Sequence, residues 1–229
     1  DAALVCRAGE RALLGRGEPA VVQLQSRGAE PLVLPGVGVP GRGEKGALSP
    51  LHDGGQSVAE REGARPVREH VQRRIYDFYA PGEYAQEAPA EPWERLRVSV
   101  DYGTVNPTSM GLWALKDGVW YRVDEYYYDS RTEGRQKTDE EYVDALEELT
   151  RGRRIERVIV DPSAASFIET LRRRGFRVMR ANNAVADGLR VTADLLKKRR
   201  LVICWSCKDC LREMESYEWV NDGSGHDVP

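Results

Sequence analysis

The alternation of apolar and polar positions is clearest from residue 96 onward. Over residues 96–101 it predicts a strand with its apolar side chains on one face and Asp101 on the opposite face, at the carboxyl end. Residues 110–115 and 119–128 are two further strand candidates, and the Lys-Asp-Gly sequence at 116–118 favours a hairpin turn between them. These three strands are therefore expected to form an antiparallel meander.

After the meander, helical and strand patterns alternate. Residues 138–141, Thr-Asp-Glu-Glu, form a capping-box sequence that predicts a helix reaching about residue 150. Residues 157–161 predict a short strand rich in β-branched side chains, which Pro162 ends. The remaining expected elements are a helix over 163–175, a strand over 176–179, a helix over 186–200, a strand over 201–204 and a helix from 206. This order favours an α/β fold with a mixed sheet flanked by helices.

The first 72 residues differ sharply in composition from the rest. They contain no Phe, Trp, Tyr, Ile, Met, Asn or Thr, and prolines interrupt them, among them Pro31, Pro35, Pro40 and Pro50. One interpretation is a segment of low order, because so few large apolar groups cannot offset the entropy of folding. The other is a mistranslated segment from a misread frame of a GC-rich gene. We therefore expect one folded domain over 73–229 and assign no function to 1–72.

Composition excludes several classes of protein. Lysines and arginines number 34 against 37 acidic residues, for a net charge of −3, so a globally basic nucleic-acid binder is not indicated. No apolar run approaches the roughly 18–20 residues that span a bilayer, and no secretory signal is visible. Four cysteines, three of them at 204, 207 and 210, do not suggest a disulfide framework. An intracellular protein without a membrane partner is expected.

Two aspartates at strand ends are the main candidates for chemistry. If the strands that end at Asp101 and Asp161 are parallel neighbours, both carboxylates lie at the edge where α/β sheets place their ligands. Two close carboxylates repel each other, and a divalent cation removes the conflict. Paired Mg²⁺ or Mn²⁺ ions about 3.5–4 Å apart hydrolyse phosphodiesters in such sites. The alternative is that each aspartate only caps a loop or helix, which is a serious alternative for Asp161 before Pro162.

The cysteine cluster and the basic residues each have two interpretations. The Cys-x-x-Cys-x-x-Cys spacing suits a metal, but its thiols fall on the apolar face of a predicted helix, so core packing is favoured. Arg190, Lys197 and Lys198, with the two arginines that follow, are candidates to contact DNA phosphates near the two aspartates. A solvated helix face is the equally good alternative for these basic residues.

Several segments resemble the C-terminal nuclease domain of the phage terminase large subunit, over about residues 73–229. They are 101–109 (Asp-Tyr-Gly-Thr-Val-Asn-Pro-Thr-Ser), 126–128 (Tyr-Tyr-Tyr), 158–164, 187–191, 195–202 and 215–219 (Glu-Ser-Tyr-Glu-Trp). The resemblance implies a ribonuclease H-like fold and a metal-dependent DNA endonuclease that uses two Mg²⁺ or Mn²⁺ ions. It implies catalytic, metal-binding roles for Asp101 and Asp161.

The same resemblance implies partners and a location. Double-stranded DNA would be the substrate, and the full-length protein would work with an ATPase motor domain, a portal and a small terminase subunit. The location would be the cytoplasm of a bacterial host, with the protein encoded by a phage or prophage.

The chain also departs from the family's pattern. The third acidic ligand of the family normally lies in a later His-x-x-Asp-Ala-Leu-Arg-like helix, which this sequence does not reach. The adjacent His226 and Asp227 do not match that spacing, so the third ligand stays unknown. The Gly-x-x-x-x-Gly-Lys-Ser/Thr loop of an ATPase motor is absent as well. We therefore expect a nuclease domain truncated at its C-terminus.

Two other functions remain open from the sequence. Asp101-Tyr-Gly-Thr104 also fits the phosphate loop of an actin-like or sugar-kinase-like ATPase, although Asp161-Pro-Ser163 lacks the glycines of the second loop such proteins need. A non-catalytic fragment that only binds DNA or a packaging partner is the other alternative.

Overall fold

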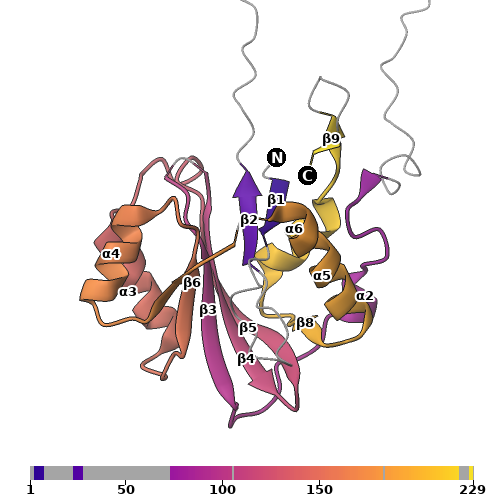
Figure 1. Cartoon of the computed structure of the whole chain (residues 1–229), viewed down its shortest axis with the longest axis horizontal. Helices are drawn as coiled ribbons and strands as arrows, with labels where there is room; N and C mark the ends of the chain where they lie inside the picture. Colours follow the sequence, from indigo (N-terminus) through magenta and orange to yellow (C-terminus); the bar gives the residue numbers. More distant parts are fainter. Residues whose placement is uncertain are drawn as a thin grey trace, which may run out of the picture.

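The fold is built around a mixed six-stranded sheet (Figure 1). The computed structural model describes residues 3–7, 23–27, 73–104, 106–182, 184–221 and 227–228. The strand order across the sheet is β7-β6-β3-β4-β5-β8. The strands are β3 (Arg95–Asp101), β4 (Thr108–Lys116), β5 (Val119–Tyr128), β6 (Arg157–Val160), β7 (Val178–Arg180) and β8 (Leu201–Ile203).

Five of the six strands run in the same direction, so their carboxyl ends lie at one edge of this sheet. β3, β4 and β5 form the expected antiparallel meander, while β6 pairs in parallel with β3, β7 with β6, and β8 with β5. β4 therefore runs against the other strands of the sheet. The carboxyl ends of those other strands share one edge, which we call the carboxyl edge, and the opposite edge is the amino edge.

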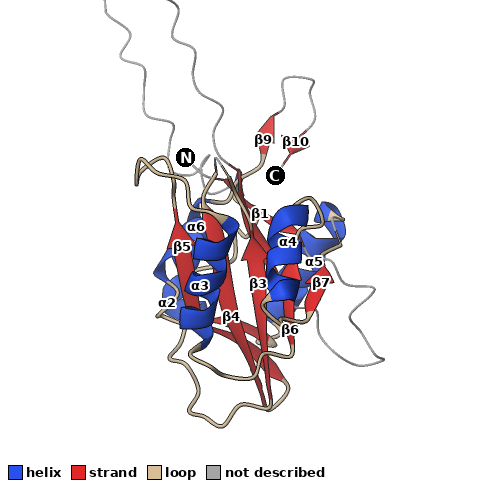
Figure 2. Cartoon of the chain, turned by 90° about the vertical axis from the view of Figure 1, so that its left-hand side faces the viewer, coloured by secondary structure: helices blue, strands red, loops and turns tan. Residues whose placement is uncertain are grey.

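Helices cover both faces of the sheet. Figure 1 shows α3 and α4 on one face and α5 and α6 on the other, and Figure 2 looks onto α3 and α4 in front of the strands. The helices are α2 (Pro81–Tyr84), α3 (Asp139–Thr150), α4 (Ala165–Arg173), α5 (Val185–Lys197) and α6 (Lys208–Ser216). The predicted element order and the mixed sheet flanked by helices are confirmed.

Each face of the sheet has its own apolar core, because the strand side chains alternate between the two faces. Val98, Val100 and Val160 pack against α3 and α4. Ile159, Trp113 and their neighbours pack against α5, α6 and the aromatic segment 75–79. The sheet is therefore buried on both sides, which explains the continuous apolar stretches of β4 and β6.

Local signals in the sequence formed the structures they predicted. Thr138 caps α3 through the complete capping box, with Glu141 bonding back to the backbone N–H of Thr138. Asp117 and Gly118 both have positive φ, 51° and 72°, as a type I′ hairpin turn requires. The start of α3 and the turn between β4 and β5 therefore lie where the local sequence predicts them.

Element ends were less accurate. α5 ends at Lys197 instead of residue 200, because the chain turns through a left-handed residue at Arg199 (φ 55°) before β8. β7 starts at Val178 instead of residue 176. The two residues before it, Phe176 and Arg177, already bond to α4 and β6 but lie outside the ladder. Helix-terminal turns of this kind depend on tertiary contacts more than on local pattern.

Two short hairpins lie outside the large sheet. β1 (Ala3–Arg7) pairs with β2 (Gln23–Arg27), and β9 (Val220–Asn221) pairs with β10 (Asp227–Val228). β2 lies against β3 and β4, while β1 lies against α5 and α6 (Figure 1). The sequence predicted neither β1 nor β2, and the apolar run 31–35 lies outside the described residues. Within the described segments, no helix is long and apolar enough to cross a bilayer.

Candidate functional site

Asp101 and Asp161 are brought to the same level of two neighbouring parallel strands. Val100 pairs with Val160 across β3 and β6; Asp101 is the last residue of β3, and Asp161 directly follows β6. Both side chains are buried, with Asp101 7% and Asp161 4% exposed. The placement on which the metal hypothesis depends, two carboxylates at the carboxyl edge of adjacent parallel strands, is therefore present in the fold.

Asp161 also has a structural contact of the kind the alternative interpretation expected. Its Oδ1 accepts a hydrogen bond from the backbone N–H of Ser163 at 2.7 Å, and its carbonyl accepts one from Ala164 at 3.1 Å. These bonds fix the turn that leads into α4, whose N-terminal end attracts negative charge. A capping role and a ligand role are compatible, because a carboxylate has two oxygens with several acceptor positions.

The loop after Asp101 is held tightly. Thr108 Oγ1 bonds to both the N–H and the carbonyl of Gly103, at 3.2 and 2.9 Å. A Cβ at Gly103 would lie 2.3 Å from the carbonyl oxygen of Asn106, so only glycine fits there. Tyr102 stacks on Phe167 at 4.7 Å between ring centroids. The glycine of the Asp-Tyr-Gly-Thr motif thus has a steric role within its own loop.

The row of polar side chains continues from Asp101 across the meander. Asp101 pairs with Ser109 on β4, and Ser109 pairs with Tyr127 on β5. Tyr127 donates a hydrogen bond to Glu213 of α6, and burial, followed by this carboxylate, raises the pKa of Tyr127. One level of the sheet therefore carries a polar row from Asp161 to Tyr127, on the face that α6 covers.

Glu213 is a buried acid beside this row. It is 4% exposed, and its Oε1 has no hydrogen-bond partner. Burial raises the pKa of Glu213 to about 7, although the Tyr127 hydroxyl and the charges of Arg212 and Arg122 act in the opposite direction. The position titrates near neutral pH for this reason.

A buried arginine lies beneath the row. Arg122, 1% exposed, donates to Ser109 Oγ at 3.2 Å and to Glu125 Oε2 at 3.3 Å. Glu125 in turn accepts the backbone N–H groups of Asp209 and Cys210 at 2.7 and 3.2 Å, which fixes the start of α6 on β5. These bonds tie the sheet, the polar row and α6 into one network.

The cysteine cluster is part of the core. Cys204, Cys207 and Cys210 are buried free thiols. Burial raises the pKa of Cys204 and of Cys207 to about 12, which favours the protonated thiols of a packed core. Among the described residues, no group of three or more His, Cys, Asp or Glu side chains is arranged to hold a metal ion.

The basic residues expected near the aspartates occupy different places. α5 runs from the carboxyl edge after β7 to the amino edge before β8, so Lys197 and Lys198 lie at the far end of the sheet from Asp101. The fold therefore does not place these two lysines beside the aspartates, and their contact with DNA phosphates stays a prediction. Arg190 lies nearer the carboxyl edge, within an exposed i,i+3 contact to Asp187 at 3.6 Å.

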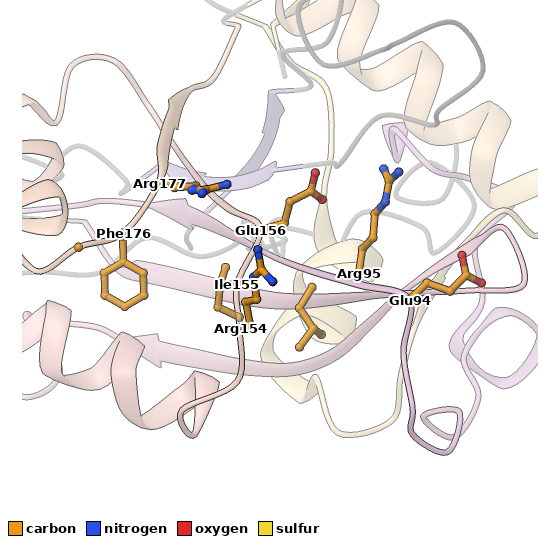
Figure 3. A pocket seen from close by; sticks show the side chains of 9 residues that line it. Glu94, Arg95, Arg154, Ile155, Glu156, Phe176 and Arg177 are labelled. Carbon is orange, nitrogen blue, oxygen red and sulfur yellow. The ribbon is translucent and has the colours of Figure 1, made fainter.

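A pocket of about 540 Å³ lies at the amino edge, away from the aspartates. Figure 3 shows the side chains around it, which come from the starts of β3, β6 and β7 and include Arg95, Arg154, Glu156 and Arg177. Arg97 holds Glu156 through a bond of 2.9 Å. The pocket is separate from the polar row at the carboxyl edge, and we do not include it in the candidate site.

Comparisons with known proteins point to one family. No protein-family model matches the chain. The large terminase of a thermophilic bacteriophage, solved in complex with ADP, is 44% identical, with a TM-score of 0.65 over 69% of this chain and 40% of that one. The terminase large subunit of Escherichia phage T5 is 24% identical over 130 residues, 56% of this chain and 28% of that protein. The P22 large terminase nuclease domain shares the fold, at 14% identity and a TM-score of 0.54 over 68% of this chain and 83% of that one.

These likenesses confirm two predictions. The resemblance to the phage terminase large subunit holds in sequence and in fold, and the fold is the ribonuclease H-like fold of terminase nuclease domains. The chain spans about two fifths of the length of the thermophilic phage's large terminase and less of the T5 protein.

Sequence reasoning missed Arg122, Ser109, Tyr127 and Glu213. Arg122 and Tyr127 lie on a predicted strand, and Ser109 directly precedes another. The shared level of Ser109 and Tyr127 becomes visible only when the register of the strands is known. Glu213 lies within a predicted helix whose apolar positions were identified. A carboxylate among them was a signal that could have been found, since acids are seldom buried without a partner.

Proposed function

We infer from the ribonuclease H-like fold and the likeness to phage large terminases that this chain is a metal-dependent DNA endonuclease domain of a packaging terminase. It cleaves phosphodiester bonds of double-stranded DNA at the carboxyl edge of its sheet. The observation that carries the proposal is the equal register of Asp101 and Asp161 on adjacent parallel strands. A buried pair of carboxylates is costly unless a cation or a proton compensates it.

The donor set suits Mg²⁺ or Mn²⁺. Asp101 and Asp161 offer hard oxygen ligands, which these ions prefer, and the buried cysteines do not compete. Two such ions, when bound, would supply an activated water and charge stabilisation at the phosphate. No third carboxylate among the described residues completes the set, so we propose that the remaining ligands are water, DNA phosphate oxygens or residues outside the described ranges.

The residues around the pair keep the carboxylates in place. The backbone N–H of Ser163 holds one oxygen of Asp161, and the Gly103–Thr108 bonds fix the loop after Asp101. Preorganised ligands need no rearrangement when a metal and a phosphate arrive. These hydrogen bonds therefore position the two carboxylates and do not contact the substrate themselves.

The wider assignments rest on the family. We propose that the chain works as part of a longer terminase subunit with an ATPase motor domain, and that this subunit meets a portal and a small terminase subunit. Its place would be the cytoplasm of a bacterial host carrying the phage or prophage. The support is the likeness to the large terminase of the thermophilic phage, of which the chain covers 40%.

Nicking of supercoiled plasmid tests the proposal. The chain is expected to nick in Mn²⁺, and Asp101→Ala and Asp161→Ala are expected to remove nicking. The unfolding temperature of Asp101→Ala should stay equal or rise, since carboxylate repulsion is relieved, whereas Asp161→Ala also loses the hydrogen bond to the backbone N–H of Ser163. In parallel, Mn²⁺ should raise the unfolding temperature of the wild-type chain and not that of either variant. Nicking that survives in the Asp101→Ala preparation would exclude the assigned site.

A non-catalytic fragment that binds DNA or a packaging partner is the second candidate. The absence of a third carboxylate beside Asp101 and Asp161, within the part of the chain that the structure describes, favours it. The two candidates differ in the plasmid assay, because a binding fragment shows Mn²⁺-independent DNA binding without nicking. The actin-like ATPase alternative has less support, since Gly103 is required by its own loop and residues 161–163 lack glycine.

A further inference from the structure

Arg212 is an exposed cation at the end of the polar row. Its guanidinium carbon lies 5.5 Å from the centroid of the Tyr127 ring, and its side chain is 60% exposed. Tyr127 lies two strands from Asp101 at the same level, which is a distance of roughly 10 Å at the usual strand spacing. The guanidinium is therefore near the aspartate pair but too far away to take part in their cation site.

Contacts between α6 and β5 fix the position of Arg212. Glu125 accepts the first N–H groups of α6, and the neighbouring Glu213 accepts the Tyr127 hydroxyl. Both contacts hold α6 against β5, and the Tyr127 ring supports the guanidinium from its face. The cation is thus presented on a rigid element, as recognition of a phosphate requires.

The contact between Arg212 and Asp209 does not remove this capacity. Arg212 Nη1 lies 2.7 Å from Asp209 Oδ1 across one helical turn, and the side chain of Arg212 is exposed while that of Asp209 is half-buried. A partly exposed pair of this kind contributes little free energy, so a phosphate can replace or share it. The planar guanidinium keeps further N–H donors for a second anion.

We propose that Arg212 binds a DNA phosphate next to the one cleaved at Asp101 and Asp161. The inference rests on the proposed nuclease function and adds the direction in which the DNA strand lies. The DNA strand runs from the aspartates along the carboxyl edge of the sheet toward Arg212 on α6. A cation at that place offsets the repulsion between the acidic pair and the DNA backbone.

Binding of a short fluorescein-labelled duplex, measured by anisotropy in EDTA over a series of salt concentrations, tests the inference without cleavage. Arg212→Gln is expected to weaken binding about ten-fold at low salt, the loss of one charged hydrogen bond. It should lower the slope of log K against log salt by about 0.9, the loss of one phosphate contact. Arg212→Lys should keep the slope, because it keeps the charge.

Arg151→Gln is the matched control. Arg151 is 68% exposed, has one carboxylate contact at 3.5 Å, and lies after α3 at the amino edge on the opposite face. Its slope should equal that of the wild type. An unchanged slope in Arg212→Gln, or an equal loss in Arg151→Gln, would overturn the inference, as would a wild-type chain that binds no DNA. The nuclease proposal is judged separately by the Asp101→Ala plasmid assay, so either one can fail alone.

Discussion

Gly111 leaves the space in which the buried guanidinium of Arg122 lies. A Cβ on Gly111 would stand 2.6 Å from Arg122 Cζ, and the arginine is too confined to move freely. Gly111→Ala is therefore expected to lower the free energy of unfolding by about 1–3 kcal/mol, the usual cost of overpacking. Urea denaturation measures this difference.

The matched control for that change is Gly82→Ala, since a Cβ at Gly82 meets nothing within 4 Å. Its free energy of unfolding should change by less than about 1 kcal/mol. Equal losses in the two variants would mean that Arg122 is not confined by Gly111.

Glu213 makes stability depend on pH near neutrality. The pKa of Glu213 is about 7 in the folded chain, against 4.5 for an ordinary glutamate, which is the value expected in the unfolded chain. The folded state therefore holds the proton more tightly. Stability therefore falls as pH rises from about 4.5 to about 7, because the unfolded state releases the proton first. Glu213→Gln should match the wild type near pH 4 and exceed it at pH 8 by up to about 3 kcal/mol.

Thermal unfolding of both chains over that pH range measures the effect of Glu213. A wild-type chain that gains stability relative to Glu213→Gln as pH rises would show that the carboxylate is better solvated or paired than its burial indicates. The glutamine keeps an oxygen for the Tyr127 hydroxyl, so the comparison isolates the charge.

At the scale of single elements, α3 starts where its capping box places it. Thr138 accepts the N–H of Glu141, and Glu141 accepts the N–H of Thr138. Thr138→Ala should destabilise the chain by about 1 kcal/mol, while Thr138→Ser should stay close to the wild type because it keeps the hydroxyl. Chemical denaturation that gives the same loss for both variants would assign the effect to the methyl group instead.

The elements of the sheet could be predicted because their signals are local. Alternation gave β3, β4 and β5, the Lys-Asp-Gly turn gave their connection, and β-branched residues gave β6. The ends of α5 and β7 were less accurate, since they depend on how the chain turns between packed layers. The pairing of β1 with β2 was not predicted, because residues 8–22 separate the two strands and no short hairpin turn joins them.

The site was predictable only in part for a related reason. Asp101 and Asp161 follow strands with the same alternation, so their position at strand ends was visible in the sequence. Their partners across the meander depend on strand register, which one sequence does not specify. The places of Lys197 and Lys198 depend on helix direction, and these residues turned out to lie at the amino edge.

At the scale of the whole molecule, we propose that the folded unit begins near residue 73 and that the hairpin of β1 and β2 lies against this unit without being needed for its folding. Helices from the later part of the chain cover both faces of the sheet, and Tyr76 and Tyr79 are buried in one of its cores. A chain of residues 73–229 is therefore expected to unfold in one cooperative thermal transition and to keep Mn²⁺-dependent nicking. A gradual, non-cooperative transition of this shorter chain would show that the first 72 residues complete the fold.

The central claim is that Asp101 and Asp161 share one divalent cation site. Isothermal titration of Mn²⁺ into the wild type, Asp101→Asn, Asp161→Asn and the double variant tests it most directly. The account predicts that each single change weakens Mn²⁺ binding at least about ten-fold and that the double change adds little more, because ligands of one site are not independent. Wild-type affinity in either single variant, or losses that multiply in the double variant, would contradict it.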